Sequence, residues 1–243
     1  MENLFLFILF ALIAEIIGTV SGFGSSVLFI PLAALFFDFK VVLGITAVFH
    51  VFSNVFKIYL FRHGVDRYVL FRLGIPAVIF VIIGAILTAF IPVRMIEIGL
   101  SVMLLVLSFV MIFSQKFNIK KTQLNLVFGG ALSGFLAGLL GTGGAIRGMT
   151  LIAFELEKSA FVATSALIDL GVDASRAGVY IWNGYFSKEY LTLIPALLFV
   201  AWVGSWIGKK ILERTSNANF RIIVLVVIIG TSLSQIFKVI WNM

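Results

Sequence analysis

One pattern occurs twice in this chain, at a spacing of 119 residues. Each copy has glycines inside a long apolar stretch, as Gly22-Phe23-Gly24-Ser25-Ser26 and as Gly141-Thr142-Gly143-Gly144-Ala145. The same spacing pairs polar residues of later apolar segments, namely Thr46 with Ser165, His50 with Asp169, Asn54 with Asp173 and Lys57 with Arg176. Such paired breaks and polar positions are typical of membrane proteins built from two half-repeats around a central site. We therefore predict two related halves, at about residues 1–118 and 119–243, within one domain.

The composition places the chain in a lipid bilayer. Hydrophobic residues make up 61% of the sequence and charged residues 12%, against roughly 25% charged residues in soluble domains. The absence of cysteine excludes disulfides and thiolate metal sites, and the two histidines lack metal-ligand spacing, so we expect no metal and no cofactor. We expect no nucleic-acid partner, because the net charge of +7 is not gathered in a basic run with interleaved aromatics. The start, Met1-Glu2-Asn3, lacks the basic residues of a cleavable signal, so we expect the first apolar segment to be retained.

Apolar runs of helical length predict an all-α, multi-pass fold. A bilayer crossing needs roughly 20 apolar residues. The runs fall at about 3–20, 26–37, 40–61, 69–91 and 95–114 in the first half, and at about 122–140, 145–156, 159–182, 189–208 and 220–240 in the second. The runs at 26–37 and 145–156 have only 12 residues, enough for about 18 Å of helix. We therefore expect about eight spanning helices and two glycine-broken half-helices, which either turn back within the membrane or cross it.

The basic residues distinguish these two possibilities. If each hairpin turns back, the halves are inverted and one side collects eleven basic residues: Arg62, Arg67, Arg72, Lys116, Lys120, Lys121, Lys158, Lys209, Lys210, Arg214 and Arg221. The other side then holds four: Lys40, Arg94, Lys188 and Lys238. If each hairpin crosses once, the halves are parallel and the division is eight against seven. Because cytoplasmic loops carry an excess of Lys and Arg, we predict inverted halves with both termini on the non-cytoplasmic side.

The glycine breaks are candidate anion sites. Glycine adopts backbone angles that other residues resist, so Gly22, Gly24, Gly143 and Gly144 permit sharp turns at membrane depth. Each half-helix then begins with free N–H groups and a positive dipole end, which suit an anion. Ser25 and Ser26 add hydroxyl donors. The alternative is that these glycines only allow close packing of helices.

Charged groups within the apolar runs form the second candidate feature. His50, Asn54 and Lys57 lie on one helix stripe, and Asp169, Asp173 and Arg176 repeat that spacing. Ionisable groups at membrane depth are costly and mark pathways or sites. With Glu15 and Arg147 added, three acids balance three bases. The alternatives are that these ions pair with one another and hold the two halves together, that Arg176 pairs with Asp173 on its own helix, and that Lys57 extends to the surface.

Arg147 is the strongest single candidate. It follows Gly144 by three residues, in the first turn of a half-helix whose dipole is already positive, so an anion or a carboxylate must compensate it. A bidentate guanidinium matches a sulfonate or carboxylate edge. We expect Asp169 or Glu15 as its resting partner. Asp169 and Asp173 are candidate proton carriers because a low-dielectric setting disfavours the carboxylate charge.

The remaining polar positions have two interpretations each. His50 is another titratable candidate or a helix contact. The hydroxyls of Thr46 and Ser165 either complete a ring of donors or form interhelical hydrogen bonds. Pro76 and Pro195, which are also 119 residues apart, are expected to kink equivalent helices.

The two halves share a further motif. The second half has Gly141-Thr142-Gly143-Gly144-Ala145, Ala163-Thr164-Ser165 and Gly184, and the first has Gly22-Phe23-Gly24-Ser25-Ser26, Pro31, Thr46 and Gly64. In these motifs the chain resembles the TauE/SafE family of sulfite and organosulfonate exporters, whose halves carry a Gly-x-Gly-Gly-Gly-type break, an Ala-Thr-Ser helix and a later glycine. Serines replace the later glycines of the first break, and Arg147 and Met149 stand where a proline often follows the second. The resemblance implies a cofactor-free carrier of sulfite, sulfoacetate or related sulfonates in the bacterial inner membrane.

The residues alone indicate a secondary transporter of small anions with a midplane site between the two breaks. One alternative is a passive anion channel. Another is an intramembrane serine hydrolase, which needs a serine within hydrogen-bond reach of a base such as His50. The sequence lacks the Gly-x-Ser-x-Gly elbow of many serine hydrolases.

Overall fold

The fold is all-helical throughout the part of the chain that the computed structural model describes, which is residues 2–22, 24–62, 64–113 and 120–214. The α-helices are α1 (Glu2–Ser21), α2 (Ser26–Ala33), α3 (Phe39–Leu60), α4 (Arg67–Leu87), α5 (Val93–Phe113), α6 (Gln123–Leu140), α7 (Gly144–Ile152), α8 (Lys158–Trp182) and α9 (Ile194–Arg214). A 3₁₀ helix, η1 (Lys188–Leu193), leads directly into α9. These helices match nine of the ten expected segments, and the segment expected at about 220–240 lies outside the described residues.

Five helical stretches in the described residues are long and apolar enough to cross a membrane. They are Leu4–Ser21, Phe39–Leu60, Arg67–Leu87, Gln123–Leu140 and Lys188–Arg214. The protein is therefore a multi-pass membrane protein. Helix α8 has 25 residues, but Lys158, Asp169, Asp173 and Arg176 make it much less apolar.

The glycine breaks separate a long helix from a short one in each half. Helix α6 ends at Gly141 in a left-handed conformation, with φ of 84°, and α7 begins at Gly144 with nine residues. In the first half, Gly22 and Gly24 have φ values of 64° and 87°, and α2 follows with eight residues. A left-handed backbone is costly for residues with a Cβ. The glycines therefore set the points at which the chain leaves one helix and begins the next.

Both short helices double back along the helix that precedes them. Phe7 near the start of α1 packs against Phe37, just beyond α2, with ring centroids 5.1 Å apart. Gly18 near the end of α1 packs against Ser25 at the start of α2. The second hairpin is similar, because Gly143 lies against Ser133 of α6, whereas Thr150 of α7 lies against Gly129, nearer the start of α6.

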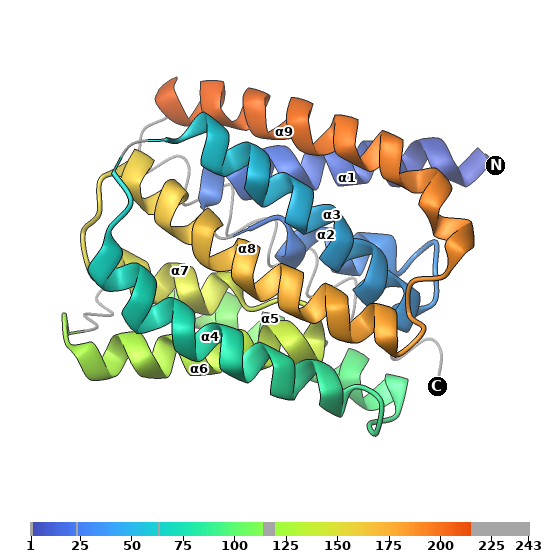
Figure 1. The fold of residues 1–243 in the computed structure, drawn as a ribbon, viewed down its shortest axis with the longest axis horizontal. Coiled ribbons are helices and arrows are strands. Elements are labelled where there is room, and N and C mark those ends of the chain that lie inside the picture. The colour runs from blue at the N-terminus through green and yellow to red at the C-terminus, as the bar shows by residue number, and fades with distance from the viewer. Residues whose placement is uncertain (1, 23, 63, 114–119, 215–243) are drawn as a thin grey trace.

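The long helices form two sets that run in opposite directions. Helices α1, α3 and α9 run one way and α4, α6 and α8 the other, with α1 and α9 at one edge, α4 and α6 at the opposite edge, and α3 and α8 between them (Figure 1). Asn54 of α3 bonds Asp173 of α8 across the middle, and the ends of these two helices meet in antiparallel register. Helices α1 and α3 therefore run opposite to α6 and α8, the helices that lie 119 residues later in the chain.

Small residues bring α4 and α6 into backbone contact. Gly134 faces the carbonyl oxygen of Ala77, and Gly138 faces that of Val81 and the backbone of Ala85, closely enough that an added Cβ would overlap them. This is the small-residue packing typical of membrane helices, where lipid gives no hydrophobic drive for helices to associate. Close packing was the alternative considered for the glycines of the two breaks, whereas these packing glycines lie within α6.

Both prolines lie within helical stretches of the corresponding segments. Pro76 is the tenth residue of α4, and Pro195 is the second residue of α9, directly after the 3₁₀ helix η1. The packing register has shifted. Gly204 of α9 packs against Glu15 of α1. At the 119-residue spacing their counterparts are Ala85 and Gly134, but Ala85 packs against Gly138, one turn further along α6.

Candidate functional site

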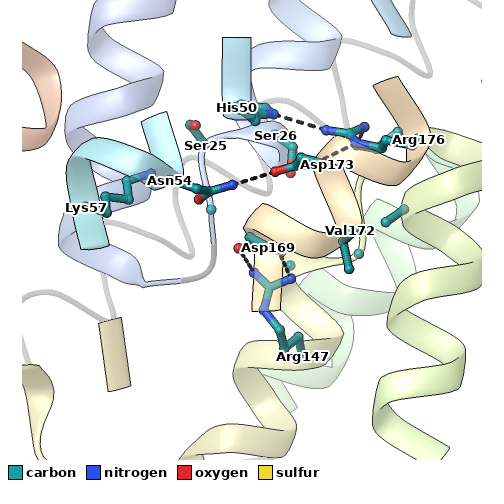
Figure 2. A pocket seen from close by; sticks show the side chains of 15 residues that line it. Ser25, Ser26, His50, Asn54, Lys57, Arg147, Asp169, Val172, Asp173 and Arg176 are labelled. Carbon is teal, nitrogen blue, oxygen red and sulfur yellow. Dashed lines mark hydrogen bonds and ion pairs between the residues drawn. The ribbon is translucent and has the colours of Figure 1, made fainter. Parts of the chain in front are cut away.

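A small cavity lies where the two glycine breaks meet the middle of α3 and α8 (Figure 2). Its volume is about 20 Å³, which holds about one water molecule and is too small for an anion of the size of sulfite. The lining residues come from five helices and both breaks. They are Gly24, Ser25, Ser26, His50, Asn54, Lys57, Ala137, Gly141, Gly143, Gly144, Arg147, Asp169, Val172, Asp173 and Arg176.

The lining includes most of the residues singled out in the sequence. Thr46, Ser165 and Glu15 are the exceptions, although all three are buried. Thr46 only donates to the Leu43 carbonyl of its own helix, at 3.2 Å. Ser165 and Glu15 contact side chains that do line the cavity, so they act one layer behind it.

The guanidinium of Arg147 binds two side chains of α8, Asp169 and Ser165. Its Nη1 and Nη2 each bond one carboxylate oxygen of Asp169, and its Nε donates to Ser165 Oγ at 3.1 Å. Ser165 in turn donates to the carbonyl of Gly22 at 3.0 Å, so the guanidinium of the second break is linked to the backbone of the first. Of the two expected partners, Asp169 is the one that binds Arg147.

A second network connects the two halves. Asn54 Nδ2 of α3 donates to Asp173 Oδ2 at 2.7 Å, and Arg176 Nε donates to Asp173 Oδ1 at 2.7 Å. Arg176 also donates to the Gly141 carbonyl at the second break and contacts His50 Nδ1 at 3.1 Å. The expected pairing of Arg176 with Asp173 on one helix is confirmed, and the same carboxylate also binds the opposite half of the molecule.

The contact with Arg176 fixes the state of His50. A guanidinium can only donate, so His50 Nδ1 must accept and the proton of the neutral ring sits on Nε2. Nε2 is buried and has no hydrogen-bond partner in the described structure. His50 therefore offers a single unused N–H donor beside the cavity.

Glu15 and Lys57 form a third buried pair, in which Lys57 lines the cavity and Glu15 lies behind it. Lys57 Nζ lies 2.9 Å from Glu15 Oε1, and both residues are almost completely shielded. Lys57 therefore does not extend to the surface, and that alternative is wrong. Four hydroxyl groups also donate to the Glu15 carboxylate: Ser25 at 2.7 Å, Ser53 at 2.7 Å, Ser205 at 2.9 Å and Thr19 at 3.2 Å.

Three of these hydroxyl residues were not predicted. Thr19 is one turn after Glu15, and Ser53 is one turn before Lys57, so helical spacing could have indicated both. Ser205 comes from α9, 190 positions away along the chain, and no local pattern marks it.

Each of the three ion pairs around the cavity forms within one half of the chain. Glu15 with Lys57, Asp169 with Arg147 and Asp173 with Arg176 are each formed within one half. The halves are joined by hydrogen bonds such as Asn54 to Asp173 and Ser26 to Thr142, the latter at 3.0 Å. The ions therefore pair with one another, as one of the alternatives held, and ions of these pairs also bond neutral side chains of the opposite half.

The arrangement expected for a serine hydrolase is not formed in the described residues. Ser25 donates to Glu15, Ser26 bonds Thr142, and His50 contacts Arg176. None of the hydrogen bonds of this part of the chain joins either serine to His50. The described residues also contain no group of three or more metal-ligating side chains.

A second cavity of about 10 Å³ adjoins the first. Gly24, Asn54, Lys57 and Asp169 line both cavities, so these four separate them. The other lining residues of the second cavity are Gly18, Gly22, Val162, Ser165 and Ala166. Because Gly22 and Val162 lie near the end of α1 and the start of α8, the second cavity points toward that end of the bundle.

Apolar spanning helices around a buried, charged, glycine-lined cavity define a multi-pass membrane protein of the transporter class. A comparison with family models makes this specific. The model described as "Sulfite exporter TauE/SafE" matches residues 7–234. The chain therefore belongs to the TauE/SafE sulfite exporter family, as its motifs suggested. No curated protein and no solved structure matches it.

Proposed function

We propose that this protein is a secondary transporter that moves sulfite, sulfoacetate or other small sulfonates across the bacterial inner membrane. The observation that carries the proposal is Arg147, a buried guanidinium in the first turn of α7 that faces the cavity between the breaks. The two terminal nitrogens of its guanidinium bind the two carboxylate oxygens of Asp169, and a sulfonate or sulfite could present two oxygens in the same way. The other cations that line the cavity, Lys57 and Arg176, are each paired with a carboxylate of their own half. The neutral donors are Ser25, Ser26, Asn54 and His50.

The architecture we propose for transport is a pair of inverted repeats. The opposite directions of α1 and α6, and of α3 and α8, support inverted halves. The doubling back of α2 and α7 supports re-entrant hairpins, with about eight spanning helices in all. We place the end with Lys209 and Arg214 in the cytoplasm and both termini on the other side, as the distribution of basic residues predicts.

Alternating access follows from the closed state of the site. A cavity of about 20 Å³ must widen before an anion can enter, which supports a site that opens and closes during transport. Rocking of one half against the other would open it. The contacts that must rearrange include Ser26 with Thr142 and Ser165 with the Gly22 carbonyl, since both join the halves at the breaks.

Flux measurements in proteoliposomes test the proposal. Purified protein is assayed with labelled sulfite, sulfoacetate and acetate as a carboxylate control. Wild type is expected to give saturable flux of a sulfur anion, and Arg147→Ala to lose it. Arg62→Ala serves as the matched control, because Arg62 is an exposed arginine outside the cavity. Absence of flux for every sulfur anion, under both a pH gradient and a membrane potential, would overturn the assignment.

The same assay separates the alternatives. A passive channel would give flux far above carrier turnover and without saturation. A hydrolase would show labelling of Ser25 or Ser26 by a serine-directed covalent probe, together with loss of labelling in the corresponding Ser→Ala variant.

A further inference from the structure

The three buried carboxylates are bound very differently. Glu15 accepts from Lys57 and from four hydroxyl groups. Asp173 accepts from Arg176 and from the amide of Asn54. Asp169, within the described residues, accepts from Arg147 alone. Its side chain is also the most exposed of the three, at 14% against 9% for Asp173 and 0% for Glu15.

Asp169 occupies the place that a substrate anion needs. Each of its two oxygens accepts a hydrogen bond from one terminal nitrogen of Arg147. A substrate anion would bind the same two nitrogens of the guanidinium. Both side chains approach Gly24, so the pair lies directly against the first break. An anion that binds the fork must therefore displace Asp169, and a displaced carboxylate would remain in a poorly solvated cavity without a cation partner.

We propose that Asp169 is the proton-binding site of the transporter and serves as an internal substitute for the substrate anion. This inference rests on the proposed function. In the arrangement seen here the carboxylate binds Arg147. When a monovalent anion takes over the guanidinium, Asp169 leaves and takes up one proton, so one negative charge and one positive charge enter together. The three acids and three bases of the site stay electrically balanced, and anion and proton travel as a one-to-one pair.

The surroundings of Asp169 single it out among the titratable groups. The charged groups near it are Arg147 from α7, Lys57 from α3, and Asp173 and Arg176 from its own helix, with His50 of α3 lining the same cavity. The parts of α2 and α6 that line the cavity contribute no charged group. Protonating His50 would bring an N–H of the ring against an N–H of Arg176, so His50 stays neutral in this arrangement.

The position of Asp169 also suits a coupling group. Asp169 lines both cavities, so it lies at the boundary between the first cavity and the second one, which points toward one end of the bundle. Release from Arg147 would move it relative to this boundary. The binding of substrate, the uptake of a proton and the opening of one side can therefore depend on a single side chain.

Gradient experiments in proteoliposomes test this coupling. The probe is methanesulfonate, a monovalent anion that does not titrate near neutral pH. For wild type, a gradient of one pH unit is expected to give about tenfold accumulation, and a membrane potential is expected to give none, because one-to-one cotransport is electroneutral. In Asp169→Asn the dependence reverses, so that accumulation follows the potential and ignores the pH gradient. Asp173→Asn is the matched control, and whatever flux it retains should still follow the pH gradient.

Two further measurements keep the test decisive. Asp169→Glu retains a carboxylate and should keep the pH dependence even if Asp169→Asn fails to fold. Purified wild type in weakly buffered detergent should take up about one proton for each methanesulfonate bound, as read by a pH indicator. If wild type carries sulfite but not methanesulfonate, the same gradients and variants are applied to sulfite at matched pH.

The outcomes separate the coupling from the transport function. No flux of any sulfur anion defeats the proposed function, and this inference with it. Flux that responds identically to both gradients in wild type and Asp169→Asn, or binding without proton uptake, overturns the coupling role of Asp169 and leaves the transporter intact.

Discussion

The buried pair of Glu15 and Lys57 allows a quantitative prediction for the stability of the bundle. Glu15→Gln preserves the shape of the side chain and removes its charge, leaving the ammonium of Lys57 buried with only neutral acceptors such as Ser53, 2.8 Å away. Loss of one partner of a buried ion pair costs about 3–5 kcal/mol, because the remaining charge is not solvated. For a protein of this size, that lowers the melting temperature by roughly 6–20 °C.

A double-mutant cycle tests the cause of this loss. Lys57→Met alone should cost less than Glu15→Gln, because four hydroxyl groups still solvate the carboxylate. The double variant should be more stable than the sum of the two single effects predicts, by about 1 kcal/mol or more. Melting in detergent, followed by tryptophan fluorescence, gives all four values. Additive losses would show that the pair is not coupled and would refute the reasoning.

Further predictions concern packing and the anion contact. Gly138→Val should destabilise the protein by about 1–3 kcal/mol, because its Cβ would overlap the Val81 carbonyl, whereas Gly178→Ala, with free space around it, should be neutral or stabilising in the same melting assay. Arg147→Lys keeps the charge but loses the fork, so sulfonate flux should fall at least about tenfold in kcat/KM; wild-type flux in this variant would mean that bidentate binding is unimportant. Asn54→Ala removes one of the two donors to the Asp173 carboxylate and leaves only Arg176, so it should lower the free energy of unfolding by about 1–3 kcal/mol, which thermal melting checks. An unchanged melting temperature would contradict a role for this bond in joining the halves.

Much of the site was predictable because its signals are local. Gly24 and Gly141 mark the breaks, since few other residues tolerate their φ values of 87° and 84°. The spacing of Asp169, Asp173 and Arg176 places three charges on one side of a helix, and the periodicity of a helix requires this whatever the rest of the fold does. The 119-residue spacing did not predict the packing of α9, because Gly204 packs against Glu15 whereas its counterpart Ala85 packs against Gly138.

The sequence by itself determined the class of protein, the positions of the two breaks and the helices that bear charge, because these follow from composition and from spacing along one helix. Only the tertiary structure decided which base pairs with which acid, since Lys57 meets Glu15 and Arg147 meets Asp169 through distances between helices. It also decided that Ser205 completes the shell of Glu15 and that Asp169 has Arg147 as its one partner among the described residues. These contacts depend on how helices far apart in the chain are packed, and no local pattern encodes that packing.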